Sequence, residues 1–249
     1  MQPDTIINAN CLDNIHRLPA GIFDLCIMDP PYEVDYASKI NNLRDMDKDS
    51  KKHINIGQVD GMHPNIPWGV FLCQLYSVMK QDSTLLIFSS QKLACKIYNI
   101  VENQDKFTFR QFLIWKKSHA TFDMTFGLKY AYTTEIIIYL QKGSRKINQR
   151  TNRIDIIEID KTNKSGFVHP TQKPIELIKF LMKDHSNPGD LIFDPFMGSG
   201  TTALAAKQSD RHFFGYEIDA KFHKVAMQRM CQEVLATTQG GLMQYAIQT

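Results

Sequence analysis

Four consecutive residues, Asp29-Pro30-Pro31-Tyr32, carry the groups needed to hold a flat ring that bears an amino group. The carboxylate of Asp29 and the carbonyl of Pro30 can each accept one amino hydrogen. The two prolines stiffen this backbone, and Tyr32 offers a face on which the ring can stack. Accepting both hydrogens draws the nitrogen toward tetrahedral geometry and frees its lone pair. The motif therefore predicts chemistry at an exocyclic amine such as adenine N6.

A glycine-containing motif later in the chain predicts a turn that closes around a small charged cofactor. It reads Asp194-Pro195-Phe196-Met197-Gly198-Ser199-Gly200-Thr201-Thr202 and lies between an expected strand and an expected helix. Glycines in this context allow a tight turn and leave no Cβ between backbone and ligand. With Ala203 the spacing also fits the dinucleotide-binding pattern, so a nicotinamide enzyme is an alternative. Glu217, at the end of the next expected strand, could accept both ribose hydroxyls of either cofactor.

Two features favour S-adenosylmethionine over a dinucleotide. The hydroxyls and backbone N–H groups of Thr201 and Thr202 suit a carboxylate as well as a phosphate. The segment His169-Pro170-Thr171-Gln172-Lys173-Pro174 adds a cation and a second helix start on the same side of the expected sheet. The α-amino acid part of the cofactor needs such a receiver for its carboxylate. A nicotinamide enzyme would also give Asp29–Tyr32 no role.

Short apolar runs alternate with helical patterns, which predicts an α/β fold with a doubly wound, mostly parallel sheet of seven strands. The expected strands are Asp4–Asn8, Phe23–Met28, Thr84–Ser89, Phe109–Trp115, Glu135–Leu140, Asp190–Asp194 and Phe213–Glu217. Helical patterns cover Pro174–Met182, Thr202–Gln208 and Ala220–Thr237. Such sheets bind ligands beyond the carboxyl ends of their strands. Asp29 follows one strand and Asp194 closes another, so both motifs are expected to line one crevice.

Composition sets limits on the class of protein. The 249-residue chain is 43% hydrophobic and 22% charged, which is ordinary for a globular protein. No apolar run approaches the ~20 residues of a membrane span, and the N-terminus lacks a signal-peptide pattern. We therefore expect a cytoplasmic protein without membrane contact. The five cysteines include no CxxC pair, and no His/Cys cluster has ligand spacing, so no metal is expected.

Two polar stretches with little periodicity, residues 35–67 and 143–167, are expected to be functional loops rather than core. The second is basic, because residues 142–164 contain seven Lys or Arg against three acidic residues. A local excess of positive charge near an expected catalytic cleft predicts a surface that contacts phosphates.

Together the motifs resemble those of the β-class amino-group DNA methyltransferases, in which the Asp-Pro-Pro-Tyr loop precedes the glycine-rich loop. Further segments also resemble the family pattern: Asn8-Ala9-Asn10-Cys11-Leu12-Asp13, Ile114-Trp115-Lys116, Thr133-Thr134-Glu135, His169–Pro174 and Tyr216-Glu217-Ile218-Asp219. The resemblance implies a Rossmann-like S-adenosylmethionine-dependent methyltransferase fold with a circularly permuted motif order. It also implies one domain over residues 1–249, with a target-recognition insertion near 143–168 and a DNA-facing loop near 35–67.

The resemblance assigns roles to individual residues. The implied catalytic residues are Asp29, Pro30, Pro31 and Tyr32. The implied cofactor contacts are Asn10, Cys11, Asp29, Thr171, Lys173, Asp194, Pro195, Phe196, Met197, Gly198, Ser199, Gly200, Thr201, Thr202, Glu217 and Ile218. The expected DNA contacts are Arg145, Lys146, Arg150 and Arg153. Asn10 departs from the family's Asp, but its side-chain oxygen can accept the same hydrogen bond from the cofactor's adenine amine.

The leading hypothesis is a site-specific DNA methyltransferase that moves a methyl group from S-adenosylmethionine to adenine N6 of a flipped-out base. Family members that act on cytosine N4 more often carry Ser at the first motif position, so Asp29 favours adenine. Cytosine N4 stays an alternative, as does a catalytically silent DNA-binding module. Double-stranded DNA is the expected partner, in a bacterial cell or a phage-infected host. A homodimer and a cognate restriction endonuclease are further partners that the resemblance allows.

Overall fold

The structure is a computed structural model that describes residues 1–31, 66–121, 130–148, 154–160 and 172–247. The predicted DNA-facing loop near 35–67 therefore lies almost wholly outside the described residues. The strands are β1 Thr5–Asn8, β2 Phe23–Met28, β3 Met79–Ser89, β4 Thr108–Thr121, β5 Tyr132–Lys142, β6 Ile156–Glu158, β7 Leu191–Asp194 and β8 His212–Glu217. The helices are α1 Cys11–Asn14, α4 Trp68–Val78, α5 Gln91–Glu102, α6 Ile175–His185, α7 Thr201–Lys207 and α8 Ala220–Ile247, with a 3-10 turn, η1, at Ile15–Arg17.

The described strands form one eight-stranded sheet in the order β1-β8-β7-β2-β3-β5-β4-β6. All neighbouring pairs are parallel except β3 with β5 and β5 with β4, because β5 runs against the rest. The α/β class and all seven predicted strands are confirmed. The predicted number of strands is wrong by one. The eighth strand, β6, has only three residues and lies in the stretch expected to be a polar loop, although Ile154, Ile156, Ile157 and Ile159 give an apolar signal there.

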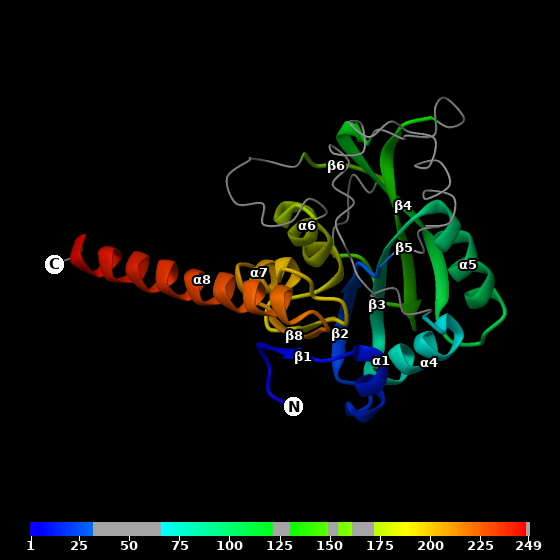
Figure 1. Cartoon of the computed structure of the whole chain (residues 1–249), viewed down its shortest axis with the longest axis horizontal. Helices are drawn as coiled ribbons and strands as arrows, with labels where there is room; N and C mark the ends of the chain where they lie inside the picture. Colours follow the sequence, from blue (N-terminus) through cyan, green and yellow to red (C-terminus); the bar gives the residue numbers. More distant parts are fainter. Residues whose placement is uncertain (32–65, 122–129, 149–153, 161–171, 248–249) are drawn as a thin grey trace, which may run out of the picture.

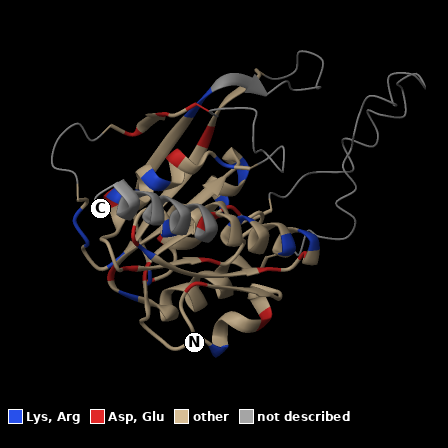
Figure 2. Cartoon of the chain, turned by 90° about the vertical axis from the view of Figure 1, so that its left-hand side faces the viewer, with Lys and Arg blue, Asp and Glu red and all other residues tan. Residues whose placement is uncertain are grey.

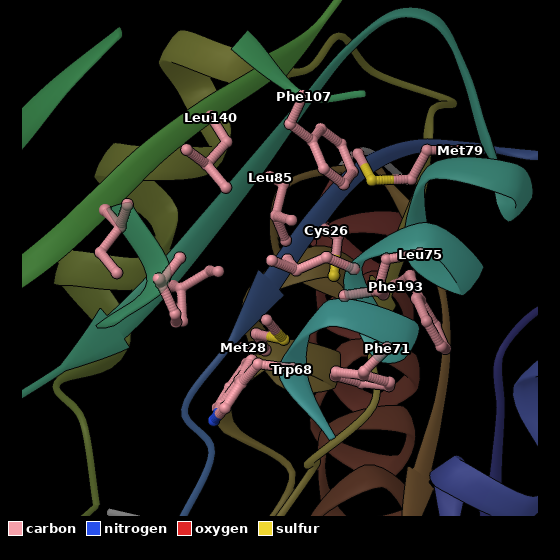
Figure 3. Close-up of a cluster of buried hydrophobic side chains, with 14 of the residues drawn as sticks. Cys26, Met28, Trp68, Phe71, Leu75, Met79, Leu85, Phe107, Leu140 and Phe193 are labelled. Atoms are coloured by element: carbon pink, nitrogen blue, oxygen red, sulfur yellow. The ribbon is translucent and has the colours of Figure 1, made fainter. Parts of the chain in front are cut away.

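Helices cover both faces of the sheet (Figure 1). On one face α4 and α5 pack against the sheet, with Trp68, Phe71 and Leu75 of α4 buried beside Cys26 and Met28 of β2 (Figure 3). On the other face α6, α7 and α8 pack against the residues of β2 that alternate with these, Leu25 and Ile27. A strand buried on both faces reads as a continuous apolar run, which is why β2 was detectable in the sequence.

Helix α8 is longer than predicted. It runs past the expected end at Thr237 and through Gly240-Gly241 to Ile247, and its distal part projects beyond the sheet (Figure 1). Glycine weakens a helix by about 1 kcal/mol but does not remove a backbone donor as proline does, so it need not end one. No helix in the part of the chain that the structure describes is long and apolar enough to span a membrane.

Candidate active site

Asp29 and Asp194 lie at the carboxyl ends of neighbouring parallel strands. Strand β2 pairs with β7 through Leu25 with Ile192 and Cys26 with Phe193, so the residues that follow β2 and close β7 reach the same edge. The side chain of Asp29 is one-third exposed, and Asp194 is buried. The two predicted motifs are thus brought together as expected. Tyr32 and Thr171 lie outside the described residues.

Lys173 contacts the carboxylate of Asp29. Its Nζ lies 2.6 Å from Asp29 Oδ2 and 2.8 Å from Glu135 Oε1, and Glu135 also pairs with Lys117 at 2.9 Å. Burial acts to lower the pKa of Lys173, but the charges of Asp29 and Glu135 outweigh it, so the pKa is raised. The predicted cofactor cation is therefore a charged partner of the predicted catalytic carboxylate.

The glycine turn is held by left-handed backbone and by helix α8. Gly198 has φ +55° and Gly200 has φ +83°, a region that side chains rarely adopt. A Cβ on Gly200 would also lie 2.9 Å from the Cβ of Ala226 in α8. From the same helix, Arg229 Nη1 donates to the carbonyl of Ser199 at 2.6 Å, to Ser199 Oγ at 3.2 Å and to Thr201 Oγ1 at 3.4 Å.

Two buried carboxyl groups flank this turn. Glu217 Oε2 accepts from the backbone N–H of Gly198 at 2.6 Å, and its Oε1 accepts from Asp219 N–H at 2.8 Å. Asp194 Oδ1 accepts from Phe196 N–H at 2.9 Å, and Thr202 donates to the same carboxyl group. Burial raises the pKa of Glu217, and burial raises that of Asp194 to about 7 despite these donors. Glu217 therefore fixes the turn through Gly198.

The remaining predicted cofactor residues differ in how far they are exposed. Ile218 is 49% exposed beside Glu217, and Gly198 and Phe196 are partly exposed, so all three can contact a ligand. Buried residues support the turn instead: Cys11, Pro195, Met197, Ser199, Thr201 and Thr202. Asn10 caps α1, since its Oδ1 accepts from Leu12 N–H at 3.1 Å. Asp would cap this helix equally well, so the cap accounts for either residue at this position.

Two of the predicted DNA contacts lie at the wrong edge of the sheet. Because β5 is antiparallel, it begins near the Asp29 edge and ends at Lys142, which pairs with Ser83 at the opposite edge. Arg145 follows there and lies 4.0 Å from Asp190, the residue before β7, with its side chain 16% exposed. Lys146 is exposed at the same edge. Arg145 is thus an internal ion-pair partner, and neither residue is near Asp29; Arg150 and Arg153 lie outside the described residues.

The sequence analysis gave no role to Glu135, which it quoted only within a family-like segment, and did not name Arg229. Glu135 directly precedes the apolar run Ile136–Leu140 of β5, and a lone acid at such a position is a usable signal. Arg229 lies three residues after the buried Ala226 and directly before the buried Met230, so a charge falls beside the core face of α8. Among the described residues no group of three or more His, Cys, Asp or Glu could hold a metal ion.

An open α/β sheet whose strand ends carry an amine-accepting carboxylate and a glycine turn backed by a buried acid defines a Rossmann-like methyltransferase. The residues present fit S-adenosylmethionine: the partly exposed Gly198 has no Cβ, with the nearest atom 4.0 Å from where one would lie, and Glu217 and Ile218 offer a carboxylate and an apolar surface beside it. Comparison with known proteins carries this one step further.

The chain belongs to the N6/N4 DNA methylase family, whose model matches residues 23–228. The Type II methyltransferase M.HpaI of Haemophilus parainfluenzae is 26% identical over 250 residues, which cover 92% of this chain and 74% of the relative. Among solved structures, the M1.HpyAVI–SAM complex has a TM-score of 0.65 at 23% identity and covers 91% of this chain and 98% of that one. The cytosine-N4-specific PvuII DNA methyltransferase has a TM-score of 0.69 at 13% identity, and the match covers 90% of this chain and 84% of that one.

Membership of this family confirms the resemblance stated from the sequence and the methyltransferase fold, with S-adenosylmethionine as the cofactor. The solved structures, at 13% and 23% identity, support the fold alone. The family includes both amino groups in its name, so it leaves the acceptor base open between adenine N6 and cytosine N4.

Proposed function

We propose that this DNA methyltransferase acts on adenine N6. One observation carries the proposal: the Asp29 carboxylate lies at the end of β2, on the strand next to the one that ends in the glycine turn. An acceptor amine at Asp29 and a methyl donor at the turn would therefore meet at one edge of the sheet.

In this proposal the chain's own residues position the amine. Asp29 accepts one amino hydrogen, and the carbonyl of Pro30 accepts the other. Pro31 restricts the backbone conformation of this loop. Tyr32 supplies the stacking face. When bound, S-adenosylmethionine supplies a methyl group on a sulfonium, which is activated for in-line displacement. Catalysis then depends mainly on orientation, and the target base must leave the duplex to reach Asp29.

The proposed cofactor contacts follow the geometry of the turn. Gly198 admits the methionine part close to the backbone, Gly200 lets the turn pack against α8, and Ser199, Thr201 and Thr202 shape the turn. Glu217 holds the ribose and Ile218 packs on the adenine ring. Asn10 and Thr171 complete the proposed pocket, and Asp194 anchors the start of the turn.

Adenine is proposed over cytosine because the first residue of the catalytic motif is Asp rather than Ser, which favours adenine in the family resemblance. Cytosine N4 stays the second candidate, and the cytosine-N4-specific PvuII enzyme among the structural neighbours is the observation in its favour. A silent DNA-binding module is a third, less favoured reading. It would leave the glycine turn and the Asp29 site without a reaction to perform.

We propose double-stranded DNA as the substrate, contacted through the segments near residues 35–67 and 143–168. In the second segment the proposed contacts are Lys146, Arg150 and Arg153, while Arg145 lies 4.0 Å from Asp190. Figure 2 shows basic and acidic positions interspersed along the described ribbon. M.HpaI is a bacterial Type II methyltransferase, which supports a bacterial or phage setting in the cytoplasm and a cognate restriction endonuclease as partner.

The test is transfer of labelled methyl from S-adenosylmethionine to unmethylated DNA, followed by nucleoside analysis. We expect N6-methyladenine from the wild type and at least ~100-fold less from Asp29→Ala, because that variant loses the acceptor for an amino hydrogen. A cooperative thermal unfolding transition and retained cofactor binding would show that the variant is folded. N4-methylcytosine would reverse the base assignment. Retained cofactor binding without incorporation into any DNA would favour the silent module.

A further inference from the structure

A row of alternating charges crosses the sheet beside the catalytic motif. Asp29 follows β2, Phe88 lies in β3 and Glu135 lies in β5, and β3 is between β2 and β5 in the sheet. Lys173 enters from the segment before α6, and its Nζ lies 5.0 Å from the centre of the Phe88 ring. The ammonium group therefore sits above the middle strand and joins two carboxylates that are two strands apart.

The same face continues to β4. Side chains two residues apart on a strand share a face, which puts Glu135 with the buried Ile137 and Lys117 with the buried Trp115. Register pairs Trp115 with Glu135, and Lys117 lies 2.9 Å from Glu135 Oε2. The order across the sheet is therefore carboxylate, ammonium, carboxylate, ammonium.

Because Lys173 and Glu135 are buried, each needs a partner of opposite charge. Side-chain exposure is 10% for Lys173 and Glu135, against 33% for Asp29 at the crevice. A charge withdrawn from water to this extent is tolerated only when it is paired and hydrogen-bonded. Without Glu135, Lys173 would have lost one of its two charged partners, and its position between the strands would be less well determined.

We propose that Lys173 and Glu135 are positioning residues for Asp29: the Lys173 ammonium, fixed by Glu135, orients the Asp29 carboxylate toward the incoming amine. The inference rests on the proposed function and deepens it, because it assigns Lys173 to the amine side of the reaction rather than to the cofactor's carboxylate. A carboxylate can accept several hydrogen bonds, so an oxygen held by Lys173 does not exhaust the acceptor capacity of Asp29.

The test compares Lys173→Met and Glu135→Gln with the matched control Glu176→Gln. Glu176 is also an ion-paired glutamate, 3.2 Å from Lys179, but its side chain is 56% exposed and lies outside the row. Single-turnover methyl transfer is measured at saturating S-adenosylmethionine, and cofactor affinity and thermal unfolding are measured separately. We expect the rate to fall about 100-fold in Lys173→Met and about tenfold in Glu135→Gln, since a small misplacement of a reacting group costs factors of this size.

Two further readouts separate positioning from loss of fold. Cofactor Kd should stay within about threefold of wild type in both variants, and Lys173→Arg should recover part of the rate because it restores the charge in a different shape.

The outcomes are distinguishable. A tenfold or greater rise in cofactor Kd with an unchanged saturating rate would place Lys173 in the cofactor pocket and overturn the inference. So would a rate loss in Glu176→Gln equal to that in Glu135→Gln, or a rate in Lys173→Arg no higher than that in Lys173→Met. If the wild type transfers no methyl to DNA, the proposed function fails and the inference fails with it. If the wild type is active and the variants match it, only the inference fails.

Discussion

At Gly200 the cofactor turn contacts helix α8, and this position is constrained both by its backbone conformation and by the space available. Its φ of +83° disfavours any side chain, and its missing Cβ leaves room for Ala226. Gly189 has the same backbone constraint without the steric one: its φ is +85°, but no atom lies within 4 Å of the place where a Cβ would lie. The two glycines therefore form a matched pair for measuring strain with and without a steric clash.

We expect Gly200→Ala to destabilise the fold by about 2–4 kcal/mol, from left-handed strain and from displaced packing against α8. Gly189→Ala should cost about 1–2 kcal/mol, from strain alone. Urea unfolding measures both, and cofactor titration should show weakened binding only for Gly200→Ala. Equal unfolding free energies for the two variants would mean that contact with α8 does not constrain the turn.

At the level of elements, helix α8 supports the cofactor turn although α7 and β8 lie between them in the sequence. Arg229 reaches from the helix to the carbonyl and hydroxyl of Ser199 and to the hydroxyl of Thr201. Burial lowers the pKa of the Arg229 guanidinium. The ordinary pKa of arginine is so high that the group stays charged. A charged donor to a backbone carbonyl contributes more than a neutral one.

Arg229→Met should therefore loosen the turn and raise the Kd for S-adenosylmethionine about tenfold, which corresponds to about 1.4 kcal/mol. Methionine keeps most of the apolar stem, so the unfolding midpoint should change little. Lys224→Met, which removes an exposed cation from the same helix, serves as the control and should leave cofactor affinity unchanged. Equal affinities for the two variants would remove Arg229 from the support of the turn.

The elements also show what a sequence can and cannot predict. Strands such as β2 were predictable because they are apolar on both faces, and the two motifs were predictable because their residue types are rare in combination. The direction of β5 was not, since Ile136–Leu140 reads the same in either orientation. Because β5 is antiparallel, Arg145, which was expected to contact DNA, lies at the edge opposite Asp29 and pairs with Asp190. The contact of Lys173 with Asp29 likewise depends on how α6 packs against β3, which motif spacing does not encode.

For the molecule as a whole, buried carboxyl groups at the site should affect stability as pH changes. The folded protein binds a proton at Asp194 up to about pH 7, whereas an ordinary Asp has a pKa of 3.8, so the pKa is raised on folding. Between these values the folded state holds more protons than the unfolded state, and stability falls as pH rises. The full effect is on the order of 4 kcal/mol.

Asp194→Asn should remove this dependence while keeping an acceptor for the Phe196 N–H. We expect the unfolding free energy of the variant, relative to wild type, to increase between pH 5 and pH 8 in denaturant titrations. Burial lowers the pKa of His185 to about 4, which acts in the opposite direction, but His185 is present in both proteins and cancels in the comparison. Asp105→Asn, at an exposed position, is the control, and a parallel pH dependence of Asp194→Asn and wild type would contradict the prediction.

The antiparallel course of β5 has a consequence for how enzymes built on this frame can change their targets. The backbone is at the far edge of the sheet at Asn148, which donates to the carbonyls of Lys183 and Ser186, and it is back at the Asp29 edge by Lys173. Residues 148–173 could span roughly 80 Å if extended, against about 20 Å for the height of a six-residue strand such as β2. Part of this length is used to place β6, which pairs with β4 at the outer edge of the sheet. In the proposed function this connection contacts DNA, so we expect length changes on either side of β6 to alter target specificity while Asn148 and Lys173 keep their places.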